Sequence, residues 1–206
     1  FVKEYRIVRG LAQGGMGAVY EAEYIPTGQR LALKVMHPSQ VADAKLRQRF
    51  AQEARVGAWI QSEHIVEVLR AGIDEVSGTP WLAMELLKGE TVATRVNRYA
   101  PLDAMPAAEV WAILSQLCRA LTAAHAKNVI HRDLKPENVF LTSTPRPDAP
   151  FTVKILDFGI AKRVDPYQPG SARTSAIGTP LWMAPEQNET AELTPATDVW
   201  AMGLLT

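Results

Sequence analysis

The sequence has 206 residues, and its 22 Lys and Arg balance 22 Asp and Glu to a formal net charge of zero. Apolar residues make up 47% and charged residues 21%, which excludes a disordered tail, a collagen-like repeat and a disulfide scaffold. The balanced charge argues against a nucleic-acid binder that relies on bulk phosphate attraction.

Cysteine usage and hydropathy bear on where the chain works. Cys118 is the single cysteine, so no internal disulfide can form, which is typical of a reducing compartment. No targeting signal is visible, and no apolar run approaches the ~20 residues of a membrane span. We predict a cytoplasmic location and leave open a membrane anchor elsewhere in the parent protein. Residues 198–206 read as an interrupted apolar helix, so we expect a fragment.

The first part of the chain reads as β-strands joined by turn signals, with one helical stretch. Residues 25–28 and 77–80 predict turns between strands. Apolar residues at spacings of three and four predict a helix over 41–60. Strands are predicted over 5–9, 18–23, 30–35, 65–69 and 81–85.

The second part reads as a larger, mainly helical unit. A helix predicted over 107–127 has one apolar face, formed by Val110, Leu114, Leu117, Leu121 and Ala124. Short strands are predicted over 139–141 and 153–156, and loops over 144–150 and 162–177. The predicted fold class is α+β, with a small sheet lobe, a boundary near 86–89 and a helical lobe.

Two features of the sheet lobe suggest chemistry without deciding it. The cluster Ala12-Gln13-Gly14-Gly15-Met16-Gly17-Ala18-Val19 between two strands fits a phosphate-binding loop, and a flexible hairpin is the alternative. Lys34 lies among apolar strand residues, where an unpaired buried charge is costly. Glu53 on the following helix is its candidate partner, and a snorkelling surface lysine is the alternative.

The decisive segments are His131-Arg132-Asp133-Leu134-Lys135-Pro136-Glu137-Asn138 and Asp157-Phe158-Gly159. Their separation allows neighbouring hairpin strands, which would direct Asp133, Asn138 and Asp157 toward one cleft. Carboxylate and amide oxygens are hard ligands suited to Mg²⁺, which keeps several waters and shares phosphate oxygens. A buried structural cluster of acidic residues is the alternative.

With residues 178–186 and 198–203, these segments resemble the eukaryotic-like Ser/Thr protein kinases, most closely the bacterial branch. The resemblance implies a bilobal protein-kinase-like fold in which a small antiparallel sheet lobe with one helix precedes a mainly helical, incomplete large lobe. The ATP-binding lobe would be residues 1–85, the hinge 86–89 and the helical lobe 90–206. Transfer of the γ-phosphoryl group of Mg-ATP to Ser/Thr hydroxyls of proteins would be the activity.

The resemblance also assigns a nucleotide site. The glycine loop would cover the phosphates, Lys34 would hold the α- and β-phosphates, and hinge backbone would bind the base. The residues that would bind ATP are Ala12, Gly14, Gly15, Gly17, Val19, Ala32, Lys34, Met84, Glu85, Leu87 and Phe140.

The same resemblance assigns the catalytic roles. Asp133 would accept the proton of the substrate hydroxyl, and Lys135 would neutralise the transferred phosphoryl group. Glu53 would orient Lys34. The metal ligands, for Mg²⁺ or Mn²⁺, would be Asn138 and Asp157.

A regulatory segment is implied as well. Arg132 precedes the catalytic Asp, and a buried arginine there favours an anion such as a loop phosphate. We predict autophosphorylation at Thr174, with Ser175 or Ser171 next, and a dimer is one route to phosphorylation in trans.

Three features depart from the family pattern. Ala12 replaces the first loop glycine, Gly57 stands where many relatives have a larger apolar residue, and the usual arginine partner of Glu186 is beyond the sequence. These departures predict a weaker nucleotide loop, a loosely docked helix and a fragment of reduced stability or activity.

Two other functions compete with a protein kinase. A pseudokinase scaffold would bind nucleotide without transfer, although Lys34, Glu53, Asp133, Asn138 and Asp157 are all present. A small-molecule phosphotransferase of the same fold is disfavoured by residues 178–180 and 184–186.

Overall fold

The computed structural model describes residues 2–15, 17–44, 47, 50–51, 54, 59–99, 104–143, 150–157, 181–188 and 193–205. The chain divides into two compact units. The first contains residues 1–61 and 65–88, and the second contains residues 62–64 and 89–206. Across the described residues, no helix combines the length and apolar character that crossing a membrane requires.

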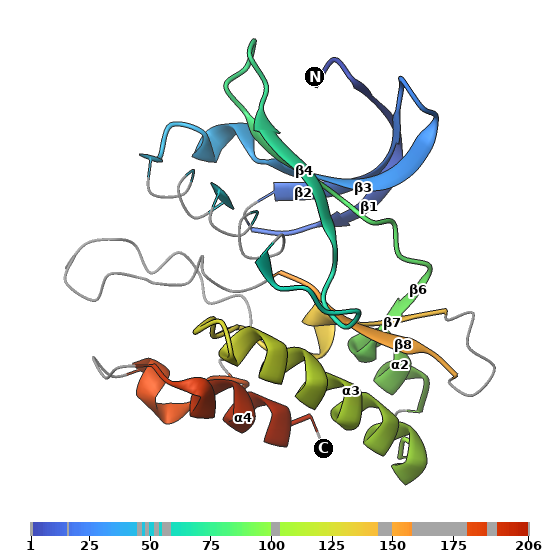
Figure 1. The fold of residues 1–206 in the computed structure, drawn as a ribbon, viewed down its shortest axis with the longest axis vertical. Helices are drawn as coiled ribbons and strands as arrows, with labels where there is room; N and C mark the ends of the chain where they lie inside the picture. Colours follow the sequence, from blue (N-terminus) through green and yellow to red (C-terminus); the bar gives the residue numbers. More distant parts are fainter. Residues whose placement is uncertain are drawn as a thin grey trace. The chain divides into compact units, whose positions relative to one another are not determined.

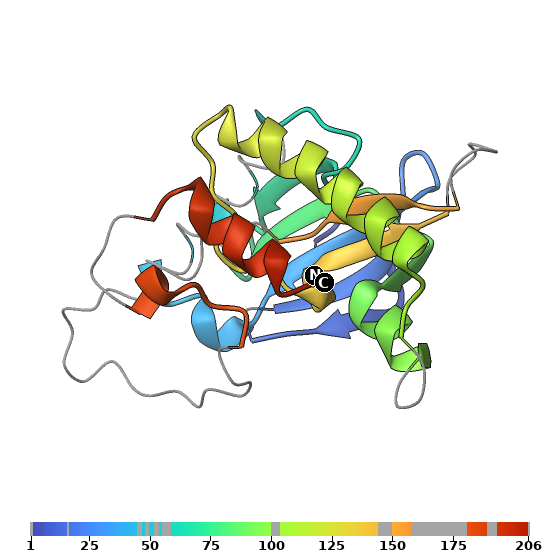
Figure 2. The ribbon, with the colours of Figure 1, turned by 90° about the horizontal axis from the view of Figure 1, so that it is seen from below.

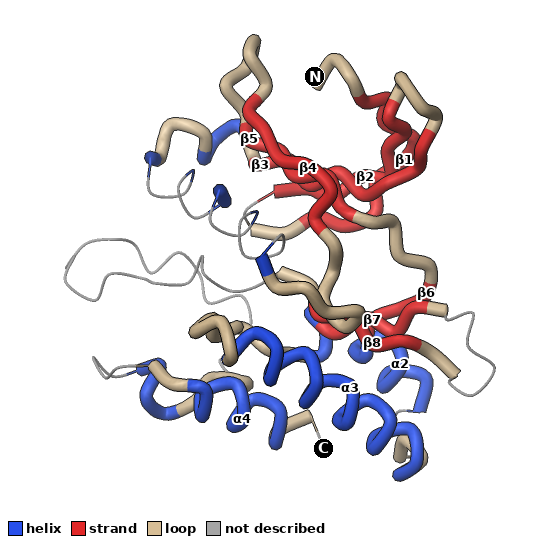
Figure 3. Tube along the Cα trace, viewed as in Figure 1, coloured by secondary structure: helices blue, strands red, loops and turns tan. Residues whose placement is uncertain are grey.

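The first unit is built on a five-stranded antiparallel sheet (Figures 1 and 3). Its spatial order is β1-β2-β3-β5-β4, so the last two strands in the chain form a hairpin that adds to β3 through β5. The strands are β1 (Tyr5–Gln13), β2 (Gly17–Tyr24), β3 (Gln29–Met36), β4 (Val68–Ile73) and β5 (Pro80–Met84).

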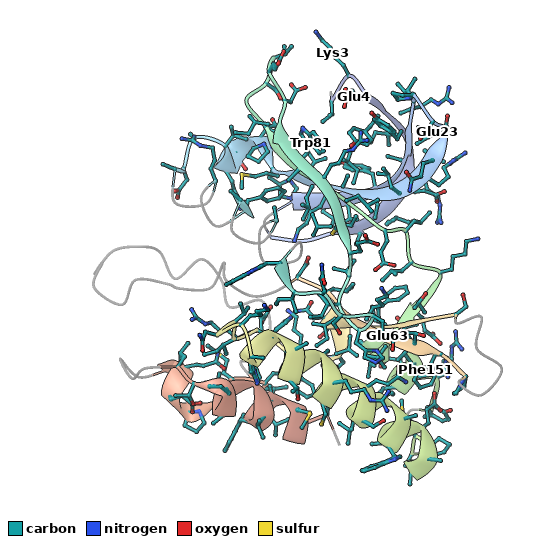
Figure 4. All side chains as sticks on the ribbon, in the orientation of Figure 1. Lys3, Glu4, Glu23, Glu63, Trp81 and Phe151 are labelled. Carbon is teal, nitrogen blue, oxygen red and sulfur yellow. The ribbon has the colours of Figure 1, made fainter. Side chains whose placement is uncertain are left out.

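One face of this sheet carries an apolar core of alternating strand residues. Opposed residues in antiparallel strands project from the same face, and the pair Leu33 and Ala83 illustrates this register. Trp81, labelled in Figure 4, packs edge-on against the ring of Tyr5, with 5.2 Å between the ring centroids. The buried members of this core are Val2, Tyr5, Ala22, Leu31, Leu33, Val35 and Ala83.

The strand predicted over 65–69 has different bounds in the structure. β4 begins only at Val68, since Ile65 forms an isolated β-bridge and Val66 lies outside the strand, although both side chains are buried. β4 continues to Ile73, where a polar turn joins it to β5. Asp74 stabilises that turn by accepting hydrogen bonds from the Ser77 amide and hydroxyl, at 2.8 and 2.7 Å. These two bonds hold the pKa of the Asp74 carboxyl below its ordinary value.

The helix predicted over 41–60 is described only in part. A 3₁₀ turn, η1 (Pro38–Gln40), precedes it, and residues 44, 47, 50, 51, 54 and 59 are helical. Phe50 and Ala54 are buried, as the apolar spacing predicted. The predicted loop over 162–177 and most of the one over 144–150 lie outside the described residues.

The second unit combines helices with a three-stranded antiparallel sheet of order β6-β7-β8. Two elements here were not predicted, β6 (Gly89–Thr91) and α2 (Val92–Tyr99). β6 is too short for a period to show, and α2 is a largely polar helix. The others are α3 (Ala107–His125), η2 (Pro136–Asn138), β7 (Val139–Thr142), β8 (Thr152–Ile155), η4 (Pro185–Asn188) and α4 (Pro195–Gly203).

Helix α3 forms the spine of the second unit, and α4 lies beside it in both ribbon views (Figures 1 and 2). The predicted face is correct in the second half of the helix, where Leu117, Leu121 and Ala124 are buried, whereas Val110 and Leu114 are only half-buried. Ile113 and Ala120, which were not part of the predicted face, are buried as well. The helix ends before Asn128, whose φ of 56° is left-handed, and the Val129 amide returns to the Ala124 carbonyl at 3.0 Å. This is the reversal by which asparagine commonly stops a helix.

Gly89, the first residue of β6, gives a direct test of the second sheet. Its φ is +152°, and a Cβ there would lie 1.9 Å from the Leu141 carbonyl oxygen. We expect Gly89→Ala to lower the free energy of unfolding by about 2 kcal/mol or more, in urea denaturation. Gly10→Ala is the control, since a Cβ at Gly10 meets nothing within 4 Å. Equal stability of the two variants would contradict the described pairing of β6 with β7.

Candidate active site

Residues 131–138, here called the catalytic turn, bring three of the predicted site residues into contact. The Asn138 side-chain amide donates to the Asp133 carbonyl at 2.7 Å and reaches the Asp133 carboxylate at 3.3 Å. The Lys135 ammonium lies 3.5 Å from the same carboxylate oxygen. Because the amide nitrogen of Asn138 is used inside the turn, its oxygen is the end left to serve as a ligand.

The catalytic turn is anchored by Asp198 of α4, a carboxylate with no solvent exposure. Asp198 accepts from the backbone amides of His131 and Arg132, each at 2.9 Å. A third bond comes from the Nε2–H of His125, at the end of α3, at 2.7 Å. Three donors offset the cost of burying this charge, and they fix the backbone immediately before Asp133.

The exit of β8 lies against the other end of the catalytic turn. The Leu156 amide donates to the Asn138 carbonyl at 2.8 Å, and His131 Nε2 lies 2.9 Å from the Leu156 carbonyl. His131 is fully buried, and its Nδ1 accepts from the Asp133 amide at 3.3 Å, which makes Nε2 the donor. Asp157, the next residue, is left-handed with φ 42°. The pairing of β7 with β8 therefore sets Asn138 and Asp157 at adjoining strand ends.

In the first unit, the register of the sheet collects five predicted nucleotide residues on one face. Ala12 pairs with Val19, and Val19 pairs with Lys34. Ala32, two residues from Lys34 and therefore on the same face, pairs with Met84. This face is opposite the apolar core, and Lys34 on it is a buried residue, 6% exposed.

The glycine cluster is shaped by one close backbone approach and two side-chain contacts. A Cβ on Gly17 would lie 2.2 Å from the Val35 carbonyl oxygen, so the pairing of β2 with β3 requires glycine there. The carbonyl of Gly14 lies 3.0 Å from His37 Nε2, and the Gln40 amide donates to the Gly15 carbonyl at 2.6 Å. His37 and Gln40, which precede the helix that begins at residue 44, thus stabilise the glycine cluster.

The remaining predicted nucleotide residues lie at the end of β5 and on β7. The Glu85 amide donates to the Glu67 carbonyl at 3.0 Å, so the backbone group with which Glu85 could meet a base is its carbonyl, which would accept. Leu87 is half-buried, and Phe140 is a half-buried residue of β7 in the second unit. Glu53, Gly57 and residues 171–175 lie outside the described residues.

Three contributors to the site were not predicted as site residues, namely Asp198, His125 and Gln187. Gln187 donates to the Arg132 carbonyl at 2.7 Å. The apolar pattern around Asp198 suggested only a buried helix, although a charged residue within an apolar helix was itself a signal for a buried partner. Glu186, whose partner was predicted to be missing, accepts from the Thr197 hydroxyl at 2.7 Å.

Comparison with known proteins decides the family. Residues 5–206 match the protein kinase domain family. The chain belongs to that family. The kinase domain is 42% identical over 201 residues to the serine/threonine-protein kinase Pkn1 of Myxococcus xanthus and 37% identical over 204 residues to PknA of Mycobacterium tuberculosis. Each match covers 98% of this chain, but only 28% and 45% of the two relatives.

Solved structures agree with the fold. The PknI kinase domain of Mycobacterium tuberculosis superposes on the whole of this chain with a TM-score of 0.76 and 31% sequence identity, and 73% of that chain is covered. The prediction of a protein-kinase-like fold is therefore confirmed. The chain spans less than half the length of Pkn1 and of PknA.

The anchoring role of Asp198 can be tested through stability. Asp198→Asn keeps the shape but places an N–H₂ group against the backbone donors, so we expect a loss of about 2–4 kcal/mol in the free energy of unfolding. Urea denaturation measures it, with Glu137→Gln as the matched carboxylate-to-amide control on an exposed residue of the same turn. If the two variants unfold at the same urea midpoint, the Asp198 carboxylate does not stabilise the catalytic turn, and the anchoring role is refuted.

Proposed function

We propose that this kinase domain transfers the γ-phosphoryl group of Mg-ATP to serine and threonine hydroxyls of proteins. The observation that carries the proposal is the catalytic turn, where Asp133 lies beside both Lys135 and Asn138. The relatives Pkn1 and PknA bear the name serine/threonine-protein kinase, which supports the same reaction for this chain.

In the proposed reaction, the substrate hydroxyl oxygen forms a bond to the γ-phosphorus as the bond from that phosphorus to the β,γ-bridging oxygen breaks. The hydroxyl proton passes to the Asp133 carboxylate, and the electron pair of the broken bond leaves with ADP. The loose transition state needs positioning and fixed positive charge more than a strong base. Lys135 supplies charge beside Asp133, and Lys34 would hold the α- and β-phosphates.

The donor set fits Mg²⁺ that arrives with the nucleotide. Among the described residues, no group of three or more His, Cys, Asp or Glu side chains could hold an ion alone. Asn138 and Asp157 would supply part of an oxygen shell, and phosphates and water would complete it. When bound, the ion neutralises phosphate charge.

A two-arm experiment separates the proposed kinase from a nucleotide-binding scaffold. In the full-length protein, Asp133→Asn should lower radiolabelled phosphate transfer from ATP to a Ser/Thr protein substrate by about 100-fold or more, because the proton acceptor is lost. Nucleotide affinity should change little. Asp43→Asn, on an exposed residue of the first unit, is the control.

Nucleotide binding by the wild type with no transfer would instead establish a pseudokinase. Phosphate transfer to a small-molecule hydroxyl but to no protein would indicate a small-molecule phosphotransferase. Either result would overturn the proposed function.

We also propose that activity is raised by autophosphorylation of residues 171–175. Arg132 is half-buried next to Asp133, where an added phosphate would gain a charge-assisted partner. Mass spectrometry of the full-length protein after incubation with Mg-ATP should find phosphate on Thr174, with Ser175 or Ser171 next. The Asp133→Asn protein is the control for contaminating kinases, and a wild type with no phosphate on this segment would refute the proposal.

A further inference from the structure

Gln187 connects two backbone segments that are far apart in sequence. Its side-chain N–H₂ donates to the Arg132 carbonyl at 2.7 Å, and its side-chain oxygen accepts from the Ala184 amide at 2.9 Å. A carbonyl on one side and an N–H on the other fix which way the amide points. The half-buried side chain of η4 thereby joins the catalytic turn to the segment 181–184.

Arg132, whose carbonyl accepts from Gln187, is held in an unfavourable backbone conformation. Arg132 has φ 68°, a left-handed value that a long side chain adopts only when its surroundings enforce it. Asp198 accepts from the amide of Arg132 on one side, and Gln187 donates to its carbonyl on the other. The peptide that Gln187 holds is the one that leads directly into Asp133.

The two residues that hold the Arg132 backbone, Asp198 and Gln187, differ in how strongly their own positions are fixed. Asp198 is completely buried in α4, so it holds the turn as long as the unit is folded. Gln187 belongs to a single 3₁₀ turn, and its orientation depends on the Ala184 amide. A shift of residues 181–184 would therefore reach the Arg132 carbonyl through one side chain.

We propose that Gln187 is a positioning residue for Asp133, coupling the seating of residues 181–184 to the orientation of the catalytic aspartate. This inference rests on the proposed kinase function. Gln187 itself contacts neither nucleotide nor substrate in this role.

Gln187→Glu is the sharpest variant. It keeps the side-chain length and the acceptor for the Ala184 amide, but turns a carboxylate oxygen toward the Arg132 carbonyl in place of the donor. Gln187→Ala, which removes both bonds without adding charge, serves if the glutamate variant folds poorly.

A second glutamine provides a matched control. Gln116 of α3 also bridges two backbone segments, since it accepts from the Val153 amide at 2.9 Å and donates to the Ala112 carbonyl at 3.1 Å. This bridge lies next to the start of β8, and the Gln116 side-chain amide is also 3.5 Å from the carbonyl of Phe151, a residue labelled in Figure 4. Gln116→Glu makes the same chemical change in the same unit without touching the catalytic turn.

In the full-length protein, Gln187→Glu should lower kcat for phosphorylation of a Ser/Thr protein substrate about tenfold, with KM for ATP and nucleotide Kd within about twofold of wild type. Gln116→Glu should leave kcat near wild type, although its thermal midpoint falls. In amide hydrogen exchange, peptides covering 131–138 should exchange about tenfold faster in Gln187→Glu than in wild type or Gln116→Glu.

Unchanged exchange of residues 131–138 in Gln187→Glu and Gln187→Ala would overturn the proposal, whatever the activity. So would a parallel loss of kcat, nucleotide affinity and thermal midpoint in both Gln187→Glu and Gln116→Glu, which would mark Gln187 as merely structural. A wild type without transfer would refute the kinase function separately, because the exchange comparison does not depend on turnover.

Discussion

The buried carboxylate of Asp198 is the interaction on which the site depends. A charge removed from water is destabilising unless donors surround it, and here the donors are two backbone amides of the catalytic turn and the ring of His125. The same bonds that satisfy the charge hold Arg132 in a left-handed conformation. Asp133, the proposed proton acceptor, thus follows a left-handed residue whose conformation the interior of the second unit enforces.

In the first unit the notable feature is a lysine, Lys34, within a strand whose neighbouring residues are buried. The sheet register sets Lys34 on the face shared with Ala12, Val19, Ala32 and Met84, while the opposite face takes the apolar core. Because successive side chains of a strand point to opposite faces, β3 places Leu31, Leu33 and Val35 in the core and Lys34 on the other face. The backbone contact at Gly17 lets β2 reach Met36 and places the end of the glycine cluster at the edge of this face.

Sequence patterns predicted the features that depend on local spacing. The turn between β2 and β3, much of the apolar face of α3 and the proximity of Asn138 to Asp133 all involve residues that are near in the chain. The pairing of β7 with β8 as a hairpin was predicted from the 19-residue separation of Asn138 and Asp157. The family resemblance supplied the chemical roles, which spacing alone left open.

The features that escaped prediction depend on long-range contacts. Asp198 binds residues 66 and 67 positions away, and Gln187 reaches back 55 positions to Arg132. No local period encodes such contacts. The strand predicted over 65–69 is observed over 68–73, where it pairs with β5, because the buried residues Ile65 and Val66 show the same apolar pattern as the start of the strand.

The most direct test of the account is a crystal structure of the full-length protein with Mg²⁺ and a non-hydrolysable ATP analogue. The account predicts an ion bound by the Asn138 side-chain oxygen and an Asp157 oxygen, with Asp133 facing the γ-phosphate and both turn amides still on Asp198. An ordered triphosphate with no ion at Asn138 or Asp157, or a catalytic turn released from Asp198, would contradict it.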